Sequence, residues 1–191
     1  MRPPVPQAYP GPDALTAAAV AAGLVVRACA GWPETPADDR VPPLAGFIES
    51  TFSPLVAQVA GRALSRRDEP PRDQVTALVI VTALGDVTSA TRVAAAVDAG
   101  TRVPPLLFFQ SVPNSVAGYV AARWHLTGPV ACVTGTAAGL AVAAIQIQDA
   151  EADEVLVVRV DVAVTDGDRD RAAAVVVTGP TGRNRPGTAE S

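Results

Sequence analysis

Residues 75–82, VTALVIVT, constrain the fold more than any other segment of this chain. Apolar side chains stand at successive positions here, so a strand built from them is buried on both of its faces. Such strands lie inside parallel sheets whose two faces are covered by helices. Shorter apolar runs predict four more strands, at residues 23–29, 130–133, 154–162 and 171–178.

Helical spacing of apolar residues occurs between these predicted strands, at residues 47–64, 86–99, 112–124 and 140–149. Strands that alternate with helices predict the α/β class, here a mostly parallel five-stranded sheet covered by helices on both faces. Segments rich in proline, glycine and polar residues predict a flexible leader at 1–13 and a flexible tail at 180–191. A single domain, residues 14–179, is expected between them.

The composition narrows the possible functions. With 49% hydrophobic residues, the 191-residue chain can bury a sizeable core. A net charge of −4 and the lack of a dense arginine cluster argue against nucleic-acid binding. All 15 basic residues are arginines, so no lysine can form a Schiff base or act as a general base.

Cysteine usage and apolar runs predict where the protein resides. Cys29 and Cys132 are too few for a disulfide framework and suit reduced thiols in the cytoplasm. The proline-rich N-terminal segment has no continuous apolar core of the kind found in signal peptides. The apolar run at 17–26 is about ten residues long, too short to span a membrane. We therefore expect a cytoplasmic protein that does not bind membranes.

Few residues could hold a metal ion or a cofactor. His125 is the only histidine, and together with two separated cysteines it gives no metal-ligand spacing. The acidic cluster at 166–170 lacks the glutamate that closes a calcium loop. Gly128, Gly135 and Gly139 do not match a dinucleotide-binding pattern, and a phosphate loop would need a lysine. We expect neither a metal nor a cofactor.

Residues 109–161 resemble a segment of the β-ketoacyl synthases. A helix containing Pro-Asn, a Gly-Pro turn, the short strand VACV and the small-residue bend TGTAAG follow one another in the family's order. Residues 77–90 and 172–178 are similar to the family's strand and turn before the second helix and to its closing strand. The resemblance implies the N-terminal half of a thiolase-like fold, of the short, chain-length-factor-like type.

The resemblance also implies which catalytic groups are missing. In the family, a cysteine at the bend takes the acyl chain, and histidines of the second half stabilise the condensation. Thr136 stands at the position of that cysteine, with Gly135 before it and Gly139 closing the bend. A threonine hydroxyl without a base is a poor nucleophile. We expect Cys132 to be a small buried hydrophobic side chain rather than a displaced nucleophile, and His125 to cap a helix or face solvent.

The implied function is that of a non-catalytic, chain-length-factor-type subunit. It would pair with a full-length β-ketoacyl synthase in polyketide, polyene or fatty-acid assembly. The strand 130–133 would lie at the sheet edge and pair across the interface, which protects an apolar edge from aggregation. The residues implied at an acyl tunnel or interface are Phe108, Phe109, Val112, Asn114, Tyr119, Val130, Cys132, Gly135, Thr136 and Gly139. The aromatic members and Val112 could equally belong to the core.

Two alternatives remain open at this point. The chain could be an acyltransferase or condensing enzyme that uses Thr136 or Cys132 with a histidine lent by its partner. It could also be a homodimer that binds an acyl chain or an acyl carrier protein.

Overall fold

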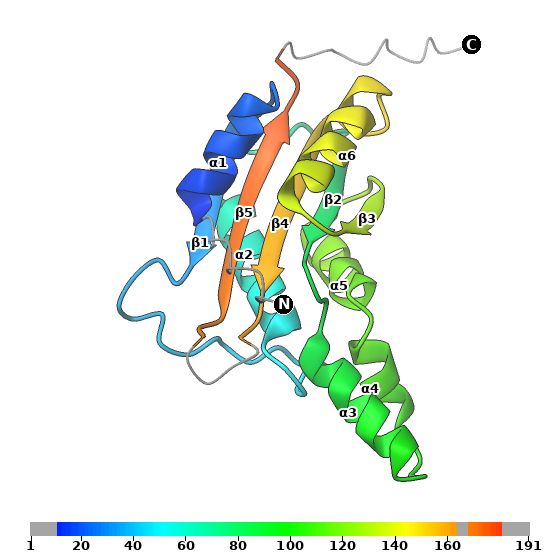
Figure 1. The fold of residues 1–191 in the computed structure, drawn as a ribbon. Coiled ribbons are helices and arrows are strands. Elements are labelled where there is room, and N and C mark those ends of the chain that lie inside the picture. Colours follow the sequence, from blue (N-terminus) through cyan, green and yellow to red (C-terminus); the bar gives the residue numbers. More distant parts are fainter. Residues whose placement is uncertain (1–10, 164–167, 181–191) are drawn as a thin grey trace, which may run out of the picture.

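The computed structural model describes residues 11–163 and 168–180 (Figure 1). The strands are β1 Val25–Trp32, β2 Thr76–Val81, β3 Val130–Val133, β4 Glu154–Asp161 and β5 Arg171–Thr178. The helices are α1 Pro12–Ala21, α2 Phe52–Arg66, α3 Val87–Asp98, α4 Pro105–Gln110, α5 Asn114–Trp124 and α6 Thr136–Gln148. Nearly all of the predicted leader and tail lies outside the described residues.

The five strands form one sheet in the order β1-β5-β4-β2-β3. Strands β4, β2 and β3 are parallel, whereas β5 is antiparallel to both of its neighbours. The short connection from β4 to β5 explains this reversal, because parallel neighbours need a long crossover. The predicted α/β class and five strands are confirmed, and the sheet is mixed because β5 runs against the other four.

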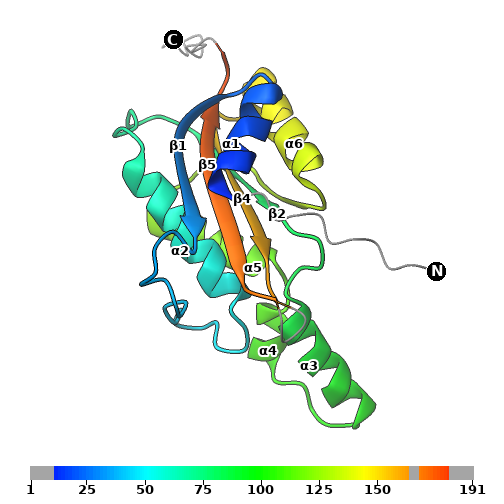
Figure 2. The same cartoon turned by 60° about the vertical axis from the view of Figure 1, so that its left-hand side comes forward.

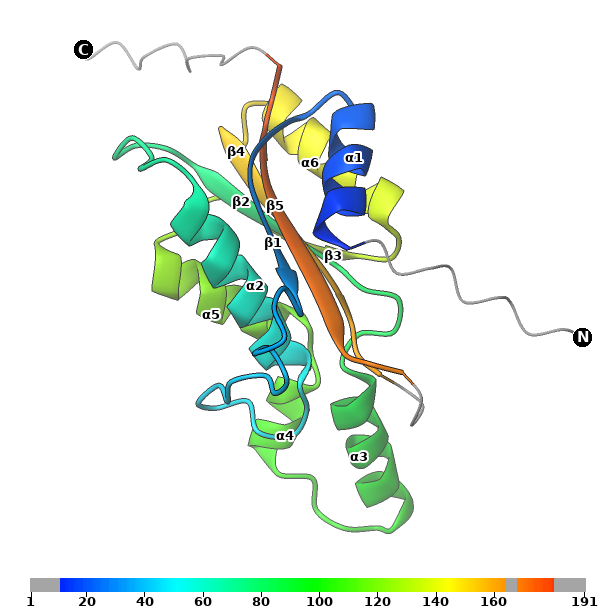
Figure 3. The ribbon, with the colours of Figure 1, turned by 90° about the vertical axis from the view of Figure 1, so that its left-hand side faces the viewer.

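Helices cover both faces of the sheet, as the sequence of β2 predicts. All six β2 residues are buried. Helices α2 and α5 pack on one face over Leu78 and Ile80. Helices α1 and α6 pack on the other face over Val79 and Val81. Figure 3 shows the two layers on either side of the strands.

Three helix starts differ from the sequence-based expectation. Helix α1 was not expected, and it begins at Pro12, inside the predicted leader. Its alanine-rich sequence lacks the polar face that makes a helical period visible. Helix α2 begins at Phe52 rather than at residue 47, with Pro54 in its first turn. Helix α6 begins at Thr136 rather than at residue 140, so the predicted bend is the first turn of a helix.

Helices α3 and α4 form an arm, residues 87–110, that projects from the body of the molecule (Figure 1). Asp86 anchors its base. The carboxylate of Asp86 caps α3 by accepting from the backbone N–H of Ser89, and it also accepts from the hydroxyls of Ser89 and Ser50. Ser89 is the only buried residue of α3. The arm is therefore held at its base and exposes most of its length.

Candidate functional site

The bend between β3 and α6, here called the elbow, is built from small residues. Gly135 has a φ of 90°, in the left-handed region that side chains with a Cβ disfavour. One turn into α6, Gly139 lies directly over β2. A Cβ at Gly139 would stand 2.3 Å from Cγ2 of Val81, so only glycine lets the helix approach the sheet this closely. These glycines place Thr136 at the first position of α6.

Thr136 is half-buried and bonded to a cation at the elbow. Nη1 of Arg159 donates to Oγ1 of Thr136 over 2.9 Å. Nε of Arg159 donates to Oδ2 of Asp161 over 3.1 Å, which fixes the guanidinium group. Within the described residues, neither a carboxylate nor an imidazole hydrogen-bonds to the Thr136 hydroxyl. Among the described residues, the hydrogen-bond partner of this hydroxyl is therefore a cation rather than a proton acceptor.

Cys132 lies on β3 opposite Ile80 of β2. Its side chain is exposed, so the prediction of a small buried side chain is wrong. The prediction failed because β3 has a strand neighbour on one side only and few atoms cover its outer positions. Nearby protein atoms nonetheless desolvate the thiol and raise its pKa above the ordinary value. A raised pKa lowers the thiolate fraction, so Cys132 lacks the environment of an activated nucleophile.

His125 ends helix α5 in a left-handed conformation, with a φ of 55°. Its side chain is exposed. The expectation of a solvent-facing residue at a helix end is confirmed. Within the described part of the chain, no three His, Cys, Asp or Glu side chains cluster as metal ligands would.

The aromatic residues implied at the tunnel or interface lie on the surface. Phe108 is 63% exposed and Phe109 is 53% exposed, and Val112, Asn114 and Tyr119 are also exposed. The alternative that these side chains belong to the core is therefore wrong for the isolated chain. They stay outside because α4 lies in the projecting arm and α5 turns one side away from the sheet.

The buried ring of Phe47, which the sequence did not single out, packs against this aromatic group. It is buried, with its ring centroid 6.3 Å from that of Phe109 and 6.2 Å from that of Tyr119. Nε2 of Gln110 also donates to the carbonyl of Gly46 over 2.6 Å, which ties α4 to the loop that carries Phe47. The exposed rings are thus held in place rather than loosely attached.

Exposed apolar residues continue from the arm to the edge of the sheet. Strand β3 is an edge strand with Val130 and Cys132 exposed, and α5 packs beside it. The predicted edge position of this strand is confirmed. Helix α5 links β3 to the arm, because it contacts both β3 and α4. We call β3 and the exposed apolar side chains of α4, α5 and the adjoining loops the edge surface; those side chains are Leu84, Leu106, Phe108, Phe109, Val112 and Tyr119. Large exposed apolar patches on soluble proteins mark interaction sites.

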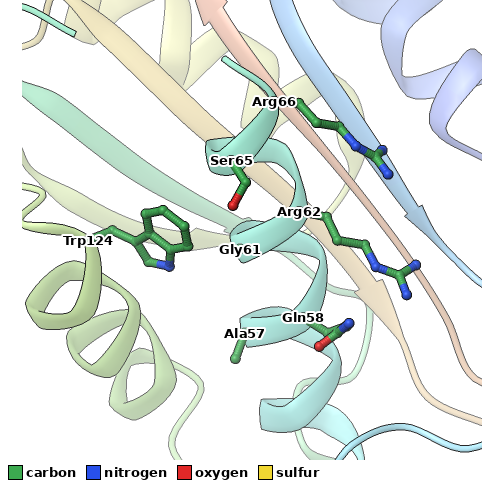
Figure 4. A pocket seen from close by; sticks show the side chains of 7 residues that line it. All are labelled: Ala57, Gln58, Gly61, Arg62, Ser65, Arg66 and Trp124. Atoms are coloured by element: carbon green, nitrogen blue, oxygen red, sulfur yellow. The ribbon is translucent and has the colours of Figure 1, made fainter. Parts of the chain in front are cut away.

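A hollow of about 380 Å³ lies between α2 and α5 (Figure 4). Gly61 faces the ring of Trp124 across it, whereas Arg62 and Arg66 point away from the ring. These arginines already bond to carboxylates, Arg62 to Asp38 and Arg66 to Glu34. The arginine charges at the hollow are therefore already compensated by carboxylates.

The residue that sequence reasoning missed at the elbow is Arg159. Strand β4 reads EVLVVRVD, and Arg159 is the one charged residue in its interior. A charged side chain within a buried strand normally has a specific partner. A charged residue in an otherwise apolar strand was the signal present in the sequence, although it does not identify Thr136 as the partner.

The sequence matches no protein-family model and no curated protein. The fold matches a solved complex of a ketosynthase with its chain length factor from Xenorhabdus doucetiae, at a TM-score of 0.64 and 16% identity over 84% of this chain and 80% of that chain. It matches the ishigamide ketosynthase/chain length factor at a TM-score of 0.61 and 18% identity over 81% of this chain. The chain therefore spans about half the length of the ishigamide chain, of which the match covers 50%.

A third similar structure is a type II polyketide acyl carrier protein in complex with its ketosynthase. Its TM-score is 0.54 at 12% identity, over 70% of this chain and 45% of that chain. At sequence identities this low, the comparisons show similarity of the fold alone. In the described part of the chain, no helix has the length and apolar character needed to cross a bilayer. The chain has the thiolase-like fold of the ketosynthases and chain length factors.

Proposed function

We propose that this chain is a ketosynthase-like subunit that transfers no acyl group itself and pairs with an active β-ketoacyl synthase in polyketide, polyene or fatty-acid assembly. The observation that carries the proposal is the edge surface, where an open sheet edge meets a group of exposed aromatic side chains. Among similar folds, two are described as a ketosynthase with a chain length factor.

The elbow supports the non-catalytic part of the proposal. Acylation of Thr136 would require a base to remove the hydroxyl proton. Its bonded neighbour is Arg159, a permanent cation that cannot accept a proton. Cys132 is no substitute, because desolvation raises its pKa. An active partner would therefore carry the acyl chain on its own nucleophile.

The edge surface supports the pairing. The outer side of β3 has no strand neighbour within the described residues, so its backbone N–H and C=O groups can bond to a strand of another chain. Phe108 and Phe109 would leave water on association, and each aromatic ring carries a large apolar area.

Co-purification tests the proposal. The chain is co-expressed with the β-ketoacyl synthase encoded nearest to it in its own genome, and the mass of the purified complex is measured. We expect a complex with equal numbers of the two chains. Phe109→Arg should abolish it, because pairing would bury an unpaired charge. Ile145→Arg adds the same charge on α6, away from the edge surface, and serves as the matched control.

Activity of the complex tests the non-catalytic role. Thr136→Ala and Cys132→Ser should leave the condensation rate of the complex within a few-fold of the unmodified rate. A loss of several orders of magnitude with Thr136→Ala would show that the chain takes part in the chemistry. If the chain does not bind the synthase, the proposed pairing is wrong.

A further inference from the structure

Strand β1 forms one edge of the sheet, with α2 beside it (Figure 2), and β3 forms the other edge. An edge strand presents backbone N–H and C=O groups that have no partner within the sheet. In an antiparallel strand both groups of one residue point to the same side, and this side alternates along the strand. The carbonyls of Cys29 and Gly31 point outward, because side chains from outside the sheet bond to them. The N–H groups of these two residues therefore point outward as well.

Side chains of α2 and of the loop after β1 occupy these outward groups. Nη1 of Arg66 donates to the carbonyl of Cys29 over 2.9 Å, and Nη1 of Arg62 donates to that of Gly31 over 3.1 Å. Oε1 of Glu34 accepts from the N–H of Gly31 over 2.7 Å. Figure 4 shows both arginine side chains extending from α2 toward β1. We call Glu34, Arg62 and Arg66 the β1 cover.

The members of the β1 cover are held by further contacts. Both Nη atoms of Arg66 donate to the Glu34 carboxylate, over 2.7 Å each. The hydrogen bond from Arg66 lowers the pKa of the Glu34 carboxyl, so this group is ionised at neutral pH. Arg62 donates to Asp38 over 2.7 Å, and its guanidinium carbon lies 4.8 Å from the ring centroid of Trp32. The two arginines stand four residues apart and therefore share one side of α2.

The β3 edge has no such cover in the described part of the chain. Its one strand neighbour is β2, and Val130 and Cys132 are exposed there. Charged side chains placed over an edge strand prevent it from pairing with other chains. The sheet therefore ends in one edge whose backbone groups are occupied and in one whose groups are available.

We propose that the β1 cover limits how the chain assembles: it closes β1 to strand addition, so that a strand of another chain is added at β3 alone. With a single open edge, association ends when that edge is paired. With two open edges, each added molecule would offer a further edge, and the contact would repeat without closure. The inference holds whichever chain pairs with β3, so it is independent of the proposed function.

Sedimentation velocity of the 191-residue chain over a concentration series tests the inference. The double variant Glu34→Ala, Arg66→Ala frees two outward groups of β1 and leaves the net charge unchanged. Its mean mass should rise with concentration to several times that of the unmodified chain. The matched control, Glu49→Ala with Arg92→Ala, removes an ion pair between α3 and the loop before α2 and should leave the mass unchanged.

A third variant tests whether growth proceeds through β1. Adding Cys29→Pro to the double variant should restore the mass of the unmodified chain, because proline removes an outward N–H and obstructs a neighbouring strand. Circular dichroism confirms that the variants are folded. Hydrogen exchange needs no variant: in the unmodified chain, the amide of Gly31 should exchange more slowly than the same amide in an unstructured peptide, because Glu34 accepts from it.

Four results would overturn the inference. The folded double variant could keep the mass of the unmodified chain at every concentration. The control variant could grow to the same extent, which would attribute the growth to loss of any ion pair. Growth could persist with Cys29→Pro, which would place the contact away from β1. The amide of Gly31 could exchange at the rate of the unstructured peptide, which would show that the cover is not in place.

Discussion

Arg159 donates a hydrogen bond from Nη1 to Oγ1 of Thr136 over 2.9 Å, where strand β4 passes the first turn of helix α6. The contact joins two residues that are 23 positions apart in the sequence. It puts a fixed positive charge beside position 136, at a helix N-terminus whose dipole also favours anions. The elbow therefore offers an environment that would stabilise a thiolate, although the residue at position 136 carries a hydroxyl.

Thr136→Cys should therefore create a thiol with a pKa below the ordinary value of about 8.5. The variant is made in a Cys29→Ser, Cys132→Ser background, and the alkylation rate is followed against pH. Adding Arg159→Gln should move the pH midpoint of alkylation upward, because the nearby cation is lost. Identical midpoints with and without Arg159 would contradict this account of the elbow.

The natural Cys132 thiol should behave in the opposite way. It is exposed, yet desolvation raises its pKa, so less thiolate is present at a given pH than in a free thiol. In Cys29→Ser, we expect Cys132 to react with iodoacetamide more slowly than glutathione at pH 8, with the difference narrowing at higher pH. A faster reaction than that of glutathione would indicate an activated thiol and would support the hypothesis that Cys132 is a displaced nucleophile.

Gly139→Ala should destabilise the chain by about 1–3 kcal/mol, because a Cβ there would stand 2.3 Å from Cγ2 of Val81. Gly118→Ala is the matched control in helix α5, since a Cβ there meets nothing within 4 Å. Replacing this exposed helical glycine should stabilise by about 0.5–1 kcal/mol. Urea denaturation gives both values, and equal effects at the two glycines would contradict the close approach of α6 to β2.

The sequence predicted β2, β4 and β5 well because these strands are buried on both faces over most of their length. The apolar run that contains β2 does not show the one-sided pattern of an amphipathic helix or strand. The predicted bounds of β3 and β5 are the bounds found in the structure. Helix α1 escaped prediction because alanines give no contrast between a buried and an exposed side. Prediction from hydrophobic periodicity depends on that contrast, and neither α1 nor α6 shows it.

The elbow could be predicted only in part. Its glycines and Thr136 follow from local sequence and from family resemblance. The partner Arg159 comes from another strand, and such long-range contacts leave no local pattern. The exposure of Phe108 and Cys132 likewise depends on how the arm projects and on which strand lies at the sheet edge.

Acid should weaken the loop that follows β1. The Asp38 carboxylate accepts from both Nη atoms of Arg62 and from the backbone N–H groups of Glu34 and Thr35. The hydrogen bond from Arg62 holds the pKa of Asp38 well below its ordinary value. Below about pH 4 the unfolded chain binds a proton that the folded chain does not, so the free energy of unfolding falls as pH falls.

Asp38→Asn should flatten this pH dependence below pH 4, because it removes the carboxylate that titrates differently in the two states. Asp39→Asn removes the same charge at the neighbouring exposed residue and is the matched control. Urea unfolding at a series of pH values measures both. An unchanged slope in Asp38→Asn would contradict the role of the Arg62 contact.

We propose that the edge surface binds a β-ketoacyl synthase. The most direct test is the native mass of the purified chain alone and mixed with the synthase encoded nearest to it. We expect a new species that contains equal numbers of both chains and is lost in Phe109→Arg. Separate masses for the two proteins at every mixing ratio, with both folded, would contradict it.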